Sequence, residues 1–268
     1  MSRSRSGHDN PSRLEAWLCG VLLVTAASAA ADPVTVRFPE GTTHGFLVLR
    51  SLQGQTLAQG ELTAVPHGDR MESRLTWRFR DGSLQDELMT YSQRPVLKLL
   101  AYKQIQRGAS FPADVEVSFA REPSRYQVKQ RERGKTDTEE LSGTLELPAD
   151  VYNGMTATVL NNLARGEIAT GHVVAFTPKP RLVKTTMRAV GEDPIIIGDT
   201  RRSATRYLID LELGGIGGVF AKVAGKEPPD LKFWVLGGSA PAFVKFEGPF
   251  FIEGPVWRIE LSSPRWPK

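Results

Sequence analysis

Residues 73–82 read Ser-Arg-Leu-Thr-Trp-Arg-Phe-Arg-Asp-Gly, and this stretch decides the fold class. Leu75, Trp77 and Phe79 alternate with three arginines and a threonine. A period of two sends apolar side chains to one face of a β-strand and polar side chains to the other. The Asp-Gly pair at 81–82 leads into another strand pattern and is the strongest short hairpin signal. The stretch therefore predicts an antiparallel strand with one buried face.

The same alternation recurs at 114–119, 206–213 and 256–261, with turn residues between the segments. Trp257 is in phase with Ile259 and Leu261, so we expect both Trp77 and Trp257 to lie on buried faces. Residues 95–106 are ambiguous between helix and strand, and we favour a strand. Antiparallel sheet dominates the chain on this interpretation.

One segment breaks the period of two. In 150–165, Val151, Met155, Val159 and Leu163 recur every four residues, which is typical of an amphipathic helix. Asp150 is placed to cap the first turn, and Gly166 to follow the last. The apolar side of this helix should pack on the sheet.

The fold class predicted is therefore all-β, mainly antiparallel. We expect a strongly curved sheet or partly open barrel, with one packed amphipathic helix at about 150–165. No Pro- or Ser-rich linker divides residues 32–268, which favours a single β-rich domain. A curved sheet of this kind encloses an apolar interior that either holds a ligand or is filled by side chains.

The N-terminus predicts export. Residues 1–31 combine a basic start, an apolar run from Ala16 to Ala27, and small residues before Asp32. This order is typical of a cleavable bacterial signal peptide, with cleavage after Ala29 or Ala31. The apolar run is too short for a membrane anchor, which needs roughly 20 residues. We expect an exported protein, periplasmic or secreted.

Cysteine and charge exclude several kinds of chemistry. Cys19 is the one cysteine and lies within the leader, so the mature chain has no thiol for disulfides, catalysis or thiolate metal sites. The chain has 34 Lys and Arg against 30 Asp and Glu. The leader contains three of the basic residues and two of the acidic ones. The remaining net charge of +3 is too mild to indicate a nucleic-acid partner. No later stretch approaches membrane-spanning length.

Signature motifs for catalysis or cofactors are missing, so we predict no cofactor and no metal site. The histidines of the mature chain (His44, His67 and His172) are far apart in the sequence and favour isolated surface positions. Asp86 and Glu87 are adjacent on a predicted strand, so their side chains should point to opposite faces and cannot act as a pair. Carboxylates that converge only in the folded structure remain an alternative.

Two segments are candidate binding sites. The first is a basic strand on which Arg125, Lys129, Arg131 and Arg133 share a face. It is either an anion-binding stripe or a solvated hairpin arm, and the acidic residues 137–140 just beyond Gly134 favour the hairpin arm.

The second candidate site is the glycine-rich segment 214–226. It is either an apolar flap that gates a cavity or a loop that covers the sheet, and the covering loop is favoured. Its candidate ligand-binding residues are Ile216, Val219, Phe220 and Val223, with Lys222 and Lys226 on the polar side.

Several stretches resemble a group of uncharacterised bacterial secreted, periplasmic proteins. They are D-G-S-L-Q-D-E (81–87), L-P-A-D-V-Y-N-G-M (147–155), T-P-K-P-R-L-V-K (177–184), G-K-E-P-P-D (225–230), A-P-A-F-V-K-F-E-G-P (240–249) and G-P-V-W-R-I-E-L (254–261). The order of elements is also similar to periplasmic domains of unknown function built on a curved antiparallel sheet. The resemblance implies the architecture and supplies no catalytic residues.

The leading hypothesis is a periplasmic, non-enzymatic binding protein for a lipid-like or other apolar ligand, or for an envelope protein. The alternatives are an envelope hydrolase with a spatially assembled site and a structural or assembly factor of the envelope. A deep apolar cavity favours binding, whereas converging carboxylates with shifted pKa values favour hydrolysis.

Overall fold

A computed structural model describes residues 33–177, 179–197, 199–212, 230–251 and 253–262. The predicted signal peptide and the segment 214–226 lie outside these ranges. The elements are β1 (Thr43–Ser51), β2 (Thr56–His67), β3 (Arg70–Phe79), β4 (Leu84–Gln93), β5 (Leu97–Arg107), β6 (Ala113–Ala120), β7 (Arg125–Glu132), β8 (Glu139–Thr144), α1 (Thr156–Asn161), β9 (Ala169–Thr177), β10 (Lys179–Ile197), β11 (Thr200–Glu212), β12 (Leu231–Leu236), β13 (Ala242–Gly248) and β14 (Trp257–Leu261).

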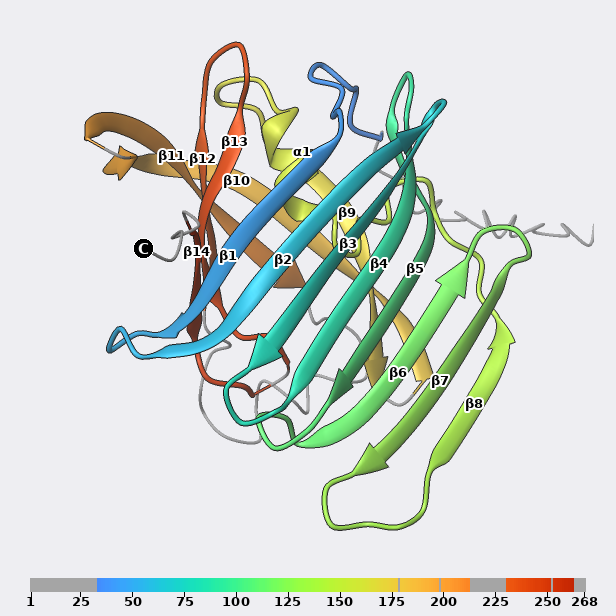
Figure 1. Cartoon of the computed structure of the whole chain (residues 1–268). Helices are drawn as coiled ribbons and strands as arrows, with labels where there is room; N and C mark the ends of the chain where they lie inside the picture. The colour runs from blue at the N-terminus through green and yellow to red at the C-terminus, as the bar shows by residue number, and fades with distance from the viewer. Residues whose placement is uncertain (1–32, 178, 198, 213–229, 252, 263–268) are drawn as a thin grey trace, which may run out of the picture.

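The strands form one sheet of 14 strands in the order β8-β7-β6-β5-β4-β3-β2-β1-β14-β13-β12-β11-β10-β9. Neighbours pair antiparallel, and β1 pairs with β14, so the two halves of the chain join in the middle of the sheet. The sheet curls into a roll, with β8 and β9 as its unpaired edges (Figure 1). The predicted all-β, strongly curved antiparallel sheet is confirmed, and residues 97–107 form a strand as favoured.

The roll overlaps itself at the β9 edge. Met187 and its partner Ala169 lie on the inner face. Val174 and Phe176 are an odd number of positions from Ala169 along β9, so their side chains point to the outer face. Phe176 nevertheless lies 6.1 Å from Phe119, which is on the inner face of β6, and Val174 is buried. The edge strand β9 is therefore tucked beneath β6, which makes the sheet a spiral and not a closed barrel.

The inner face carries the core that the alternation predicts. Trp77 and Trp257 are 1% and 7% exposed, which confirms their predicted burial. Gly60 lies directly across from Trp77, and a Cβ added at Gly60 would come within 2.5 Å of the indole ring. The missing side chain at Gly60 thus makes room for the largest residue of the neighbouring strand.

The predicted helix is shorter than expected. α1 covers Thr156–Asn161 instead of 150–165, and Met155, with no side-chain hydrogen bond, precedes it. Asp150 is not a cap, because its backbone carbonyl accepts from the His172 amide while Tyr152 donates to the His172 carbonyl. This pairing with β9 holds 150–152 extended. Val151, Met155, Val159 and Leu163 are all buried, so the apolar periodicity identified the packed side but not the backbone conformation.

Candidate functional site

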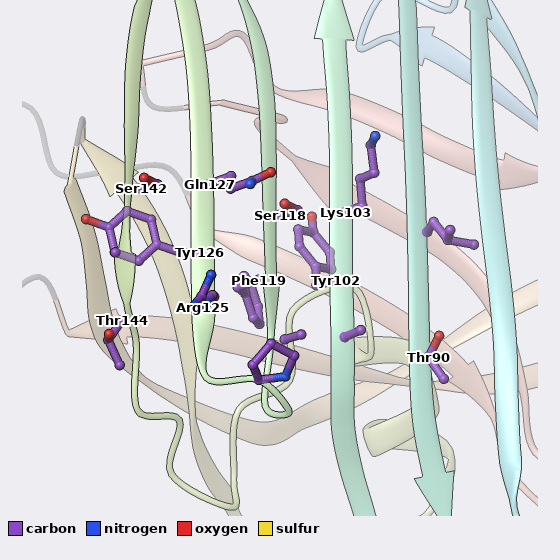
Figure 2. A pocket seen from close by; sticks show the side chains of 15 residues that line it. Thr90, Tyr102, Lys103, Ser118, Phe119, Arg125, Tyr126, Gln127, Ser142 and Thr144 are labelled. Atoms are coloured by element: carbon purple, nitrogen blue, oxygen red, sulfur yellow. The ribbon is translucent and has the colours of Figure 1, made fainter.

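Two hollows of ligand size are found among the described residues. The first, the outer groove, has a volume of about 600 Å³ and lies on the outer face of β4 to β8 (Figure 2). Two rows of directly paired residues cross these strands. They are Leu88, Lys103, Ser118, Gln127 and Ser142 in one row, and Thr90, Ala101, Ala120, Arg125 and Thr144 in the other.

The outer groove has a mixed lining of polar side chains and the aromatic residues Tyr102, Phe119 and Tyr126. Hydroxyl and amide groups dominate its rows, and the small residues Ala101, Ser118 and Ala120 form its floor. Lys103 is held by Glu116 at 2.7 Å, beside the groove. The groove is formed by adjacent strands of one part of the sheet and the Pro123 turn, so unlike the end hollow it does not bring distant chain segments together.

The second, the end hollow, has a volume of about 650 Å³ and lies next to α1, which Figure 1 shows near one end of the roll. Distant chain segments line it: residues 37–38, residues 160–166, the adjoining parts of β10 and β11 at 189–192 and 205–207, and the β12–β13 turn at 235–241. The curvature of the sheet and the short helix together create the end hollow, since no single segment forms it.

Asn162 fixes the N-terminal wall of the end hollow. This residue follows α1 and is 1% exposed. Its side-chain oxygen accepts from the amides of Arg37 and Phe38, at 2.7 and 2.8 Å, and its side-chain nitrogen donates to the Thr158 carbonyl at 2.9 Å. One carboxamide therefore joins the N-terminal segment to the helix, which satisfies buried polar groups on both.

The walls of the end hollow are apolar, and its lining includes charges of both signs, Arg37, Arg165 and Glu192. Leu160, Leu163, Tyr207 and Val235 form the wall and belong to the buried core, so the hollow reaches core side chains directly. Burial, with Glu192 and Glu167 adding to it, raises the pKa of the Tyr207 hydroxyl, which stays neutral.

The rim carries the polar groups of the end hollow. Arg37 contacts Glu167 at 3.1 Å, and Arg165 is exposed beside it. The side-chain oxygen of Asn161 is buried and has no hydrogen-bond partner among the described residues, although it belongs to a residue of the lining. An apolar pocket with a few polar groups at its rim is the usual form of a small-molecule site.

Asp86 and Glu87 lie on opposite faces of β4, as predicted. On the outer face, burial raises the pKa of Asp86, but hydrogen bonds from Arg74 and Thr76 outweigh it and lower that pKa below its ordinary value. On the inner face, burial raises the pKa of Glu87, although the Tyr102 hydroxyl donates to it at 2.6 Å. These carboxylates do not form a hydrolytic pair.

Replacing Glu87 with Gln should stabilise the protein at pH values above the folded-state pKa of Glu87 but not below its unfolded-state pKa. Because the folded-state pKa of Glu87 is raised, its favourable contribution is present below the unfolded pKa and lost as the pH rises through the folded pKa. Gln keeps an acceptor for Tyr102 without the buried charge. Urea unfolding at one pH below the unfolded-state pKa and one pH above the folded-state pKa measures the difference in stability between the variant and the wild type.

The matched control is Asp86→Asn, for which the sign reverses. The folded-state pKa of Asp86 is lowered, so its stabilising effect is present above the unfolded pKa and lost as the pH falls. Asp86→Asn should therefore destabilise the protein at neutral pH. Equal and pH-independent effects for the two variants would contradict the assignment of Glu87 to the inner face.

Asp150 and His172 form a second polar pair. Asp150 is fully buried and lies 3.0 Å from Nδ1 of His172. Arg121 donates to the carbonyls of Leu99, Leu147 and Pro148, at 2.6, 2.5 and 2.5 Å. These contacts pin the link between β8 and α1, so they position the helix wall of the end hollow.

The basic strand predicted as an anion site is mostly paired. Lys129 contacts Glu140 at 3.0 Å and Arg131 contacts Asp114 at 2.5 Å, on the neighbouring strands. Arg133 donates to the carbonyls of Ala109 and Phe111. Arg125 alone of the four lines a hollow, the outer groove. Cross-strand pairing of this kind is what a solvated hairpin arm has.

The other predicted site residues, Ile216, Val219, Phe220, Val223, Lys222 and Lys226, lie outside the described ranges and remain a prediction. Sequence reasoning missed the residues of the end hollow, such as Phe38 and Tyr207. Their signal was weak, because Tyr207 appeared only as one inward position of an alternating strand. No helix in the described ranges has the length and apolar character to cross a membrane. Within the same ranges, no group of three or more His, Cys, Asp or Glu is placed to hold a metal.

Comparison with solved structures finds a β-barrel-like protein of a domain of unknown function, DUF1849, from Brucella abortus. The two chains are 10% identical in sequence and superpose with a TM-score of 0.39. The match covers 87% of this chain and 98% of that chain. No family model matches the sequence, and no curated protein matches it significantly. The family resemblance suggested by the sequence therefore remains a prediction.

Proposed function

We propose that this protein is an exported, non-enzymatic binding protein for an amphipathic small molecule with an acidic head and an apolar tail. The observation that carries the proposal is the end hollow, whose wall consists of buried core side chains and whose rim holds Arg165 beside Glu192 and the ion pair of Arg37 with Glu167. The leader-like residues 1–31 support action in the cell envelope, where such molecules are abundant.

The energetics favour the tail as the main source of affinity. The volume of the end hollow, about 650 Å³, falls within the range of small-molecule pockets. Moving hydrocarbon from water into it yields about 25 cal/mol per Å². The head group stays at the exposed rim, where a single ion pair contributes at most about 1 kcal/mol. Arg165 therefore selects the acidic head more than it holds the ligand.

Ala189→Trp should abolish most of the binding of a fluorescent fatty acid. Ala189 lies on the inner face of β10, is exposed, and lines the end hollow. An indole that displaces about 100 Å² of ligand removes about 2.5 kcal/mol, which lowers affinity roughly 70-fold. Fluorescence titration measures the change. Thr186→Trp, on the outer face of the same strand, is the control and should bind like the wild type.

The acidic head is tested by comparing a fatty acid with the corresponding fatty alcohol. Wild type should prefer the acid by about two- to fivefold, and Arg165→Gln should remove that preference. If Ala189→Trp and Thr186→Trp both bind the probe like wild type, the end hollow is not the ligand site. Binding of an envelope protein, with no small ligand, would then be the better function. Turnover of the probe would favour a hydrolase instead.

A further inference from the structure

The end hollow lies beside a projecting two-stranded arm, formed by residues 190–197 of β10 and 200–203 of β11. β9 pairs with β10 only up to Met187, and β12 pairs with β11 only from Ala204 onward. Residues 194–197 and 200–203 therefore pair with each other alone. Four residue pairs extend about 13 Å beyond β12, and Figure 1 shows this hairpin projecting from the roll.

The tip of the arm is apolar and exposed. Ile196 is 75% exposed, the largest value among the exposed large apolar residues described, and Ile197 is 45% exposed. Exposed isoleucines are ordinary when scattered singly, but here two neighbours occupy the end of a projection. An exposed apolar tip of this kind favours an interaction site.

Arginines accompany these isoleucines. Arg201 pairs directly with Ile196, and Arg202 with Ile195, so each arginine lies on the same face as an isoleucine. Both arginines are exposed, and Asp199 is the one acidic residue near them at the turn. Long arginine side chains extend a cation away from an apolar surface, which suits a boundary between hydrocarbon and anionic headgroups.

The base of the arm is fixed. Asp193 accepts hydrogen bonds from Arg206 at 2.9 Å and from Trp234 Nε1 at 2.7 Å, and the Ser203 hydroxyl donates to Glu192 at 2.5 Å. Gly191, Glu192 and Thr205 line the end hollow as well, so the arm rises from its mouth. These contacts hold the tip in one direction relative to the hollow.

We propose that this arm docks the protein on an anionic membrane surface, with Ile196 and Ile197 entering the interface and Arg201 and Arg202 contacting lipid phosphates. The proposal deepens the proposed function and rests on it, because docking would place the mouth of the end hollow where an amphipathic ligand enters or leaves. The alternative for the tip, a second copy of this chain, is an outcome of the test.

The experiment is co-sedimentation with vesicles of phosphatidylcholine, with and without phosphatidylglycerol. Wild type should bind the anionic vesicles more tightly, and added salt should weaken this binding. The double variant Ile196→Asp/Ile197→Asp should lose at least roughly tenfold in partition to either vesicle. Arg201→Gln/Arg202→Gln should lose about 25-fold on anionic vesicles alone, since each cation contributes about fivefold.

The control is Leu52→Asp/Arg80→Gln, which changes an exposed leucine and an exposed arginine at turns of the opposite end of the roll. This variant should partition like wild type. Binding of the soluble fatty acid should be unchanged in the tip variants, which separates failure of docking from failure of the end hollow. Vesicle binding that the tip variants retain would refute docking. A wild-type dimer that the tip variants dissociate would assign the arm to a second copy.

Discussion

Trp257→Ala is expected to lower the free energy of unfolding by about 3–5 kcal/mol. The Trp257 ring is 7% exposed and lies within 5.0–6.5 Å, between ring centroids, of four phenylalanines: Phe79, Phe111, Phe250 and Phe251. Truncation leaves a large cavity and removes aromatic contacts that contribute beyond burial. Urea unfolding, followed by circular dichroism, measures the loss.

The control is Phe46→Ala on the outer face of β1. Phe46 is 42% exposed, so its truncation should cost less than about 1 kcal/mol. The two positions are both aromatic and lie on the adjacent strands β14 and β1. Equal losses at the two positions would show that the inner face of these strands is not the buried one.

Arg121→Met is the second large effect, with an expected loss of at least about 3 kcal/mol. The guanidinium of Arg121 donates to three carbonyls, and burial lowers its pKa, partly offset by Asp150. Methionine keeps most of the aliphatic stem but leaves the carbonyls without this donor. A fully buried acceptor left unsatisfied costs about 1–3 kcal/mol, so three part-buried acceptors at the lower end of that range account for the loss.

The same variant should weaken the fatty-acid probe, because two of the three carbonyls, of Leu147 and Pro148, belong to the link that carries α1 to the end hollow. Arg131→Met is the matched control. Arg131 contacts Asp114 on the surface and is half exposed, so its loss should be below about 1 kcal/mol, with probe binding unchanged. A stable Arg121→Met protein with normal binding would contradict this role.

Local patterns in the sequence were sufficient to predict the strands. Alternation assigned the faces of β3, β6, β11 and β14, because a strand side chain can point only to one face or the other. It also separated Asp86 from Glu87 and placed Trp77 and Trp257 inside. These are properties of short segments, and neighbouring residues decide them.

The helix lies at the limit of such reasoning. Apolar spacing at 151–163 correctly identified the buried side chains, but the backbone conformation at Asp150 depends on hydrogen bonds to His172, 22 residues later in the chain. A local pattern contains no information on a partner that the fold supplies. The predicted cap was therefore wrong, although the predicted packing was right.

The sequence by itself thus determined an antiparallel, inward-facing apolar sheet with a packed apolar segment in the middle of the chain. Only the tertiary structure decided that β9 is tucked beneath β6, that Asn162 holds residues 37 and 38, and that the end hollow opens beside the β10–β11 arm. The physical reason is the sequence separation of the residues involved. The face of a strand side chain follows from a repeat of two residues, whereas the end hollow needs segments about 200 residues apart, which come together only when the whole sheet curls.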